Sequence, residues 1–152
     1  MGWVSPPMMS EENTIEYHTE EIEFELPDAE KVSNWILSVV SNESKILSAV
    51  NFIFCNDPYL HSINVEYLDH DTLTDIVTFQ YSKHPYIEGD LFISMDRIKE
   101  NANTFQVPLL KELHRVMIHG ILHICGYGDK STEEKKLMRE KENAALAILE
   151  KM

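Results

Sequence analysis

The chain has 152 residues, and its 26 acidic and 13 basic side chains give it a formal net charge of −13 at pH 7. This length suits a single domain with its own hydrophobic core, and the charge excludes binding of nucleic acid through the overall field of the protein, because phosphate is bound by Lys and Arg. No apolar run reaches the length of a membrane span, and two cysteines without a secretory signal favour a reducing cytoplasm.

The first half of the chain predicts strands separated by a helix. The first ten residues have no charge and no periodicity, so we expect 1–12 to be a disordered lead-in to a single domain at 13–152. Apolar and polar residues alternate from Ile15 to Leu26, as in a half-buried strand. Asp28 is expected to cap a helix, and a second strand is predicted at 49–55. The inner face of that helix is predicted to contain Val32, Trp35, Ile36 and Val39.

A helix and a hairpin are predicted next. Asp57 and Pro58 are expected to open a helix that reaches about Leu68, since proline suits the first helical position. The segments 75–81 and 88–94 are rich in β-branched and aromatic residues and are joined by a short loop. They predict a pair of antiparallel strands.

Helices are predicted for the rest of the chain. Asp96 is expected to cap a helix to about Phe105, and Pro108 to begin the next one. Ser131 is expected to cap the last helix, with Glu134 completing a capping box. The whole order predicts an α+β domain in which a mixed sheet of about four strands is covered by helices, with a metal site on a helix-turn segment.

The metal site is predicted from the segment 119–129. His119 and His123 are four residues apart, so on a helix both rings point to the same side. Gly126 and Gly128 allow the chain to turn back, which would bring Asp129 to the same ion as a third ligand. Three protein ligands leave one tetrahedral position for water, as in catalytic zinc sites.

Other interpretations of these residues are possible. The two histidines could be core or interface residues, and Cys125 would reach the ion only if the helix ended early. His114 is about 140° away from His119 around the helix, so it is a weak ligand candidate. Gly120 occupies the position at which zinc proteases have a catalytic glutamate, which disfavours peptide hydrolysis.

The remaining chemistry needs a proton acceptor and a cation for phosphate. The candidate acceptors are Asp75 and Glu88, and the candidate cations are Arg97 and Arg115, each of which could instead form a surface salt bridge. Any nucleic-acid surface must be a local basic patch, for which the candidates are 83–84, 97–99 and 111–115. We expect the acids of the last helix, Glu134, Glu140 and Glu142, to form a solvated face.

Three motifs resemble the YbeY family of bacterial endoribonucleases, also called rRNA maturation factors. The first motif is His119–Tyr127, the second is Asn64–Tyr67 with Asp71 and Thr74–Phe79, and the third is Glu88–Ser94. The resemblance implies a single-strand-specific, metal-dependent endoribonuclease of the cytoplasm that acts in rRNA maturation and ribosome quality control. It also implies zinc as the cofactor, with phosphodiester cleavage assisted by metal-bound water, and suggests that Asp75, Thr78 and Phe79 shape the floor of the cleft.

The chain departs from the family pattern at two positions. Asp129 stands where the family has a third histidine, which would make the site less positive and favour harder ions such as manganese. Manganese and nickel are the alternatives to zinc. Leu68 stands where the family has an arginine. The alternative functions are a non-catalytic ribosome assembly factor with a structural metal, or a hydrolase of another substrate. Ribosomal RNA and small-subunit ribosomal proteins or assembly factors are the expected partners, because basic proteins would suit an acidic chain.

Overall fold

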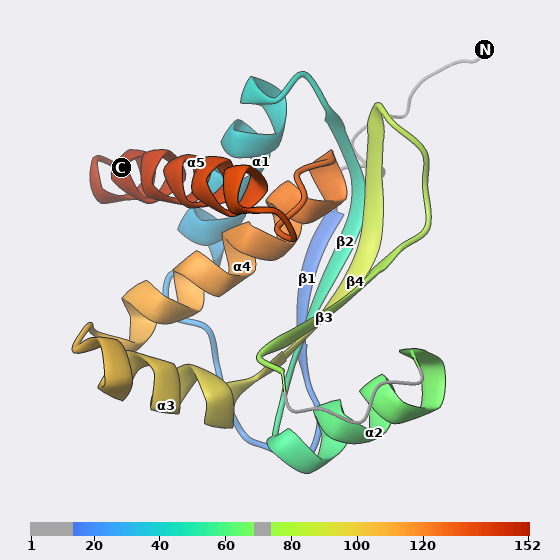
Figure 1. Ribbon diagram of the computed structural model, residues 1–152, viewed down its shortest axis with the longest axis vertical. Coiled ribbons are helices and arrows are strands. Elements are labelled where there is room, and N and C mark those ends of the chain that lie inside the picture. The colour runs from blue at the N-terminus through green and yellow to red at the C-terminus, as the bar shows by residue number, and fades with distance from the viewer. Residues whose placement is uncertain (1–13, 69–73) are drawn as a thin grey trace.

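A four-stranded mixed sheet runs through the molecule, and helices pack on both of its faces (Figure 1). The computed structural model describes residues 14–68 and 74–152, so the predicted lead-in at 1–12 and Asp71 lie outside the described residues. In chain order the elements are β1 (Thr14–Thr19), α1 (Ala29–Asn42), β2 (Ile46–Cys55), α2 (Asp57–Leu68), β3 (Ile76–Gln80), β4 (Tyr86–Ser94), α3 (Met95–Phe105), α4 (Leu109–Cys125) and α5 (Thr132–Glu150).

The strands lie in the order β1-β2-β4-β3. β1 pairs in parallel with β2, and β2 pairs in parallel with β4, whereas β3 and β4 form the predicted antiparallel hairpin. The predicted α+β class and the mixed sheet of four strands are therefore confirmed.

The main core lies between the sheet and the helices α1, α4 and α5, while α2 packs on the opposite face (Figure 1). The predicted inner face of α1 is buried as expected, and the indole Nε1 of Trp35 donates a hydrogen bond of 2.7 Å to the carbonyl of Ala145 on α5. Within the described ranges, no helix is both long and apolar enough to cross a membrane.

The predicted first strand is too long, because pairing ends at Thr19. Glu21 has a φ of 66°, which takes the backbone out of the extended conformation. The alternation continues beyond this point because the side chains still pack: Leu26 is buried, and the ring of Phe24 meets Phe54 edge-on with 5.1 Å between centroids. In this segment the alternation of apolar and polar residues therefore reflects burial of every second side chain and does not indicate pairing with another strand.

The starts of three helices differ in detail from the prediction. Asp28 occupies the N-cap position of α1, but its backbone is left-handed and its side chain makes no capping hydrogen bond. α3 is capped by Ser94, because the carboxylate of Asp96 instead accepts a hydrogen bond of 2.8 Å from the backbone N–H of Asp57. At the start of α2, it is Asn56 whose side chain accepts a backbone N–H of the first turn.

Candidate active site

α4 carries both candidate histidines and packs deep in the core. Its residue Gly120 faces the sheet, and a Cβ atom at this position would overlap with the side chains of Leu91 and Ile76. The close approach of α4 to the sheet therefore explains why residue 120 is a glycine. A glutamate at this position, directly after His119, would have no room.

His119 is held by a buried carboxylate. Its Nδ1 atom lies 2.7 Å from Oε2 of Glu142, which projects from α5 and is only 2% exposed. The other carboxylate oxygen of Glu142 accepts a hydrogen bond of 3.2 Å from Arg115. The prediction that Glu142 belongs to a solvated face is wrong. Its helical spacing from the buried apolar residues of α5 was the available signal, since Met138, Glu142, Ala145 and Leu149 follow one another at i, i+4, i+7 and i+11.

The contact between these two side chains changes the pKa of each. The hydrogen bond to Glu142 raises the pKa of His119 against the opposing effect of burial. Burial alone would raise the pKa of Glu142, but the hydrogen bonds and positive charges of His119 and Arg115 outweigh it and lower that pKa. Glu142 is therefore a carboxylate that accepts the Nδ1 proton, and Nε2 of His119 remains for another partner.

His123 is oriented by the turn that ends α4. Gly126 has a φ of 120°, and the N–H of Tyr127 donates to the carbonyl of Leu122, which closes the turn in the manner of a Schellman motif. The carbonyl of Tyr127 lies 2.9 Å from Nδ1 of His123. Because a carbonyl can only accept a hydrogen bond, Nδ1 carries the proton in this contact. In the neutral ring, Nε2 of the exposed His123 therefore has no proton.

Asp129 follows on the loop between α4 and α5. Its Oδ2 atom lies 3.3 Å from Nε2 of His119. The loop is fixed by the predicted capping box at Ser131, in which the carboxylate of Glu134 accepts the N–H groups of Lys130 and Ser131 at 3.1 and 3.0 Å. Asp129 therefore reaches His119 from a loop whose backbone is hydrogen-bonded to the first turn of α5.

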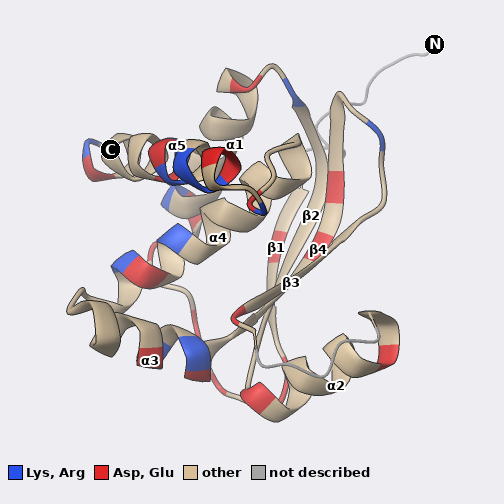
Figure 2. Cartoon of the chain, in the orientation of Figure 1, with Lys and Arg blue, Asp and Glu red and all other residues tan. Residues whose placement is uncertain are grey.

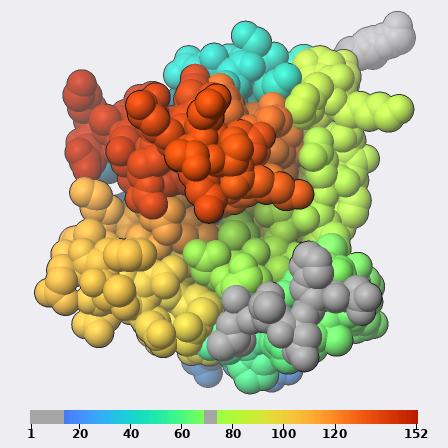
Figure 3. All heavy atoms as spheres, in the orientation of Figure 1, coloured from blue at the N-terminus to red at the C-terminus, as the bar shows by residue number. Residues whose placement is uncertain are grey.

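The three predicted ligands line one cavity of about 350 Å³. Around this region the atoms of β3 lie set back between α5 and the α2 side of the molecule (Figure 3). The cavity is lined by Asn64, Leu68, Thr74, Asp75, Ile76, Val77, Thr78, His119, His123 and Asp129, and so no Lys or Arg of the described ranges contributes to its wall.

The donor atoms fit a divalent metal ion only in part. Among residues 14–68 and 74–152, no group of three or more His, Cys, Asp or Glu side chains is arranged to hold an ion. Two donors that share a tetrahedral ion at about 2.0–2.1 Å are about 3.3 Å apart, which matches the pair of His119 and Asp129. The ring of His123 is parallel to that of His119, with 6.5 Å between centroids, and opens onto the same cavity.

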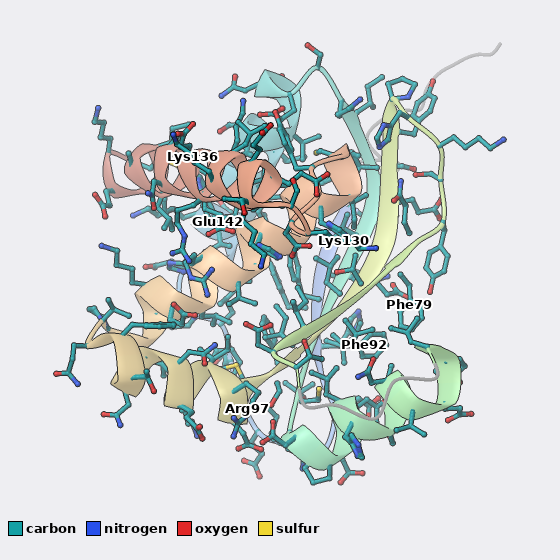
Figure 4. The ribbon with its side chains drawn as sticks, viewed as in Figure 1. Phe79, Phe92, Arg97, Lys130, Lys136 and Glu142 are labelled. Atoms are coloured by element: carbon teal, nitrogen blue, oxygen red, sulfur yellow. The ribbon has the colours of Figure 1, made fainter. Side chains whose placement is uncertain are left out.

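The candidate cations lie outside the cavity. Arg97 pairs with Asp57 at 3.1 Å and with Glu100 at 2.9 Å near the start of α3 (Figure 4). Arg115 pairs with Glu112 at 2.6 Å and with Glu142. More generally, the four strands contain no Lys or Arg, and basic residues lie mainly on the helices, among acidic ones (Figure 2). Both arginines are thus occupied by carboxylates of the protein.

The candidate proton acceptors and the residues predicted for the cleft floor line the cavity only in part. Asp75 lines the cavity and accepts a hydrogen bond of 3.4 Å from Asn101, whereas Glu88 does not line it. Thr78 also lines the cavity, but the ring of Phe79 packs against Phe92 on the α2 side of the sheet (Figure 4). Asp75 is therefore the candidate proton acceptor that the structure places beside the histidines.

Neither alternative ligand lines the cavity. Cys125 is buried at the end of α4, and burial raises the pKa of its thiol to about 11. His114 packs against Trp35, with 5.9 Å between ring centroids, and burial lowers its pKa. Neither Cys125 nor His114 is thus placed to close the site as a fourth protein ligand.

Comparison with known proteins gives consistent matches over most of the chain. A family model described as Endoribonuclease YbeY matches residues 14–150. The protein named Endoribonuclease YbeY from Flavobacterium psychrophilum is 50% identical to this chain, over 84% of this chain and 91% of its own length. The one from Flavobacterium johnsoniae is 48% identical, over 84% of this chain and 92% of its own length. The one from Amoebophilus asiaticus is 45% identical over 85% of this chain and 88% of its own. The solution structure of TM1509 from Thermotoga maritima has the same fold, with a TM-score of 0.64, 24% identity and coverage of 90% of this chain and 89% of that one.

Proposed function

The chain belongs to the endoribonuclease YbeY family, and from this premise we propose that it is a metal-dependent endoribonuclease that cuts single-stranded RNA during maturation of ribosomal RNA. One observation supports the proposal most directly. On α4, the Nδ1 atoms of His119 and His123 both contact acceptors of the protein, so that both Nε2 atoms are left for the cavity that Asp129 also lines. Histidines that bind metal usually have such a partner at the other ring nitrogen.

His119, His123 and Asp129 would hold the ion, which is zinc, with manganese and nickel as alternatives. The carboxylate ligand favours manganese and the two imidazoles suit nickel. When bound, a divalent ion polarises a phosphoryl oxygen and makes a bound water more acidic. The protein's own groups orient the substrate and move protons. Asp75 is the proposed proton acceptor, because its carboxylate lies on the wall of the same cavity.

Among the described residues, no Lys or Arg in the cavity wall is available to bind RNA. Leu68 lies where an arginine would be expected, and Arg97 and Arg115 are paired with carboxylates. We therefore propose that a ribosomal protein or assembly factor of the small subunit brings the cytoplasmic enzyme to its ribosomal RNA, since basic proteins suit an acidic surface. The missing cation also favours a second candidate function, that of an assembly factor in which the metal is not catalytic.

The test combines metal analysis with RNA cleavage. Metal content is measured by mass spectrometry on the wild-type protein and on His123→Ala, and each protein is given a labelled single-stranded RNA. We expect about one ion per wild-type chain, and loss of both metal and cleavage in the variant. His18→Ala is the matched control, because His18 is exposed on β1, away from the cavity. Metal without cleavage in the wild type would support the assembly factor, and absence of metal after loading would contradict both.

A further inference from the structure

We propose that Glu142 is a positioning residue of this site: its buried carboxylate, held by Arg115, fixes the ring of His119 with Nε2 toward the cavity and so sets the affinity for the metal ion. The inference rests on the proposed function, because it concerns the surroundings of one proposed ligand. Glu142 projects from α5 toward α4, between the two helices (Figure 4). It does not line the cavity, so it acts through His119.

The contacts form a chain of buried charges. Glu112 accepts two hydrogen bonds from the guanidinium of Arg115, at 2.6 and 3.0 Å. Arg115 donates a third, of 3.2 Å, to Glu142, whose second oxygen lies 2.7 Å from Nδ1 of His119. Glu112 and Glu142 are each 2% exposed. Both oxygens of Glu142 are therefore occupied, and the imidazole cannot flip without losing its partner.

Packing between α4 and α5 does not require this carboxylate. The neighbouring positions on the same face of α5 are apolar, with Met138 and Ala145 both buried. Apolar residues of similar volume in place of the whole Arg115–Glu142 pair would serve the contact about as well, because a buried ion pair often stabilises a fold no better than such residues. What an apolar residue could not do is accept the Nδ1 proton of His119. A carboxylate in this position raises the basicity of a ligating histidine and fixes its orientation.

The test measures metal binding without RNA. Metal-free wild-type protein and Glu142→Gln are titrated with Co²⁺, and the visible absorption of the bound ion gives the dissociation constant. Gln has nearly the same shape but no charge, and its amide group can turn a donor toward His119. We expect Co²⁺ affinity to fall by about 10- to 100-fold. Glu140→Gln is the control, because it removes the same charge from an exposed position of α5 and should leave the constant unchanged.

Urea unfolding of the metal-free proteins separates positioning from stability. Wild-type Co²⁺ affinity in Glu142→Gln, with only a lower unfolding midpoint, would overturn the inference and leave the proposed function intact. No Co²⁺ binding by the wild-type protein would overturn both. If Glu142→Gln does not fold, Glu142→Asp keeps the charge for Arg115 but shortens the side chain by one methylene. Weaker Co²⁺ binding by a folded Glu142→Asp protein then supports the inference, and unchanged binding overturns it.

Discussion

The cavity has one wall on the α4–α5 side and another on the α2–β3 side. The two walls differ in the charged groups that accompany their polar side chains. On the α4–α5 side, His119 is backed by a buried carboxylate, which is itself paired with Arg115. On the α2–β3 side, Leu68, Asp75 and Thr78 line the cavity, and no Lys or Arg of the described ranges accompanies them. In the proposed function the first wall holds the metal ion, whereas the described residues of the second wall offer no positive group for a phosphate. Metal binding and RNA binding should therefore respond to different substitutions.

The largest effect is expected from breaking the support of the first wall. Arg115→Met leaves Glu112 and Glu142 buried without their common cation, and breaking such a pair costs about 3–5 kcal/mol of unfolding free energy. Urea unfolding measures the loss. Arg97→Met is the matched control, and its loss should be smaller because the side chains of its partners Asp57 and Glu100 are 22% and 61% exposed, against 3% and 2% for Glu112 and Glu142. Equal losses in the two variants would contradict the contrast between a buried network and a surface pair.

The second wall is tested by adding the cation that it lacks. Leu68→Arg places a guanidinium at a position that lines the cavity, and a hydrogen bond to a charged group contributes about 1.5–3 kcal/mol, equivalent to a rise of about 10- to 150-fold in kcat/KM for RNA. The gain should shrink as salt is raised. Leu109→Arg adds the same charge about 15 Å along α4 from His119 and should not change kcat/KM. An equal gain in both variants would show that only net charge matters.

The smallest effect is expected at the loop between α4 and α5, which carries Asp129. Ser131→Ala removes the side chain that accepts the N–H of Glu134 in the capping box, at a cost of about 1 kcal/mol. Thermal unfolding measures the stability. Metal affinity should fall slightly in the same variant, because the loop that carries Asp129 becomes less fixed. Ser38→Ala, which alters a hydroxyl within α1, should leave metal affinity at the wild-type value.

The sequence was enough to predict that His119, His123 and Asp129 lie close together, but not which side chains hold them in place. Spacing of four on a helix is a local property, so the shared side of His119 and His123 follows from the chain itself. The glycine turn also depends on neighbours in sequence, and Gly126 has the expected positive φ. Gly128 does not have a positive φ, but a Cβ atom at this position would overlap with the carboxylate of Glu134.

Contacts between residues far apart in the sequence could not be predicted from the spacing of residues along the chain. Glu142 is 23 residues from His119, and only the packing of α5 on α4 brings them together. The same packing decides that Arg115 neutralises carboxylates and does not face the cavity. Local signals placed Asp28 correctly at the N-cap of α1 but not its missing capping hydrogen bond, and they misplaced the cap of α3 at Asp96. Any acid beside a helix start fits a capping pattern, whereas the partner of Asp96 depends on a tertiary contact.

The central claim is that one divalent ion is held by two histidines of α4 and the carboxylate that follows them. A crystal structure of the zinc-loaded protein, with anomalous differences collected on both sides of the zinc edge, tests it directly. The account predicts one peak in the cavity, about 2.0–2.2 Å from Nε2 of His119, Nε2 of His123 and a carboxylate oxygen of Asp129. A peak at Cys125 or His114, or none in crystals grown with excess zinc, would contradict it.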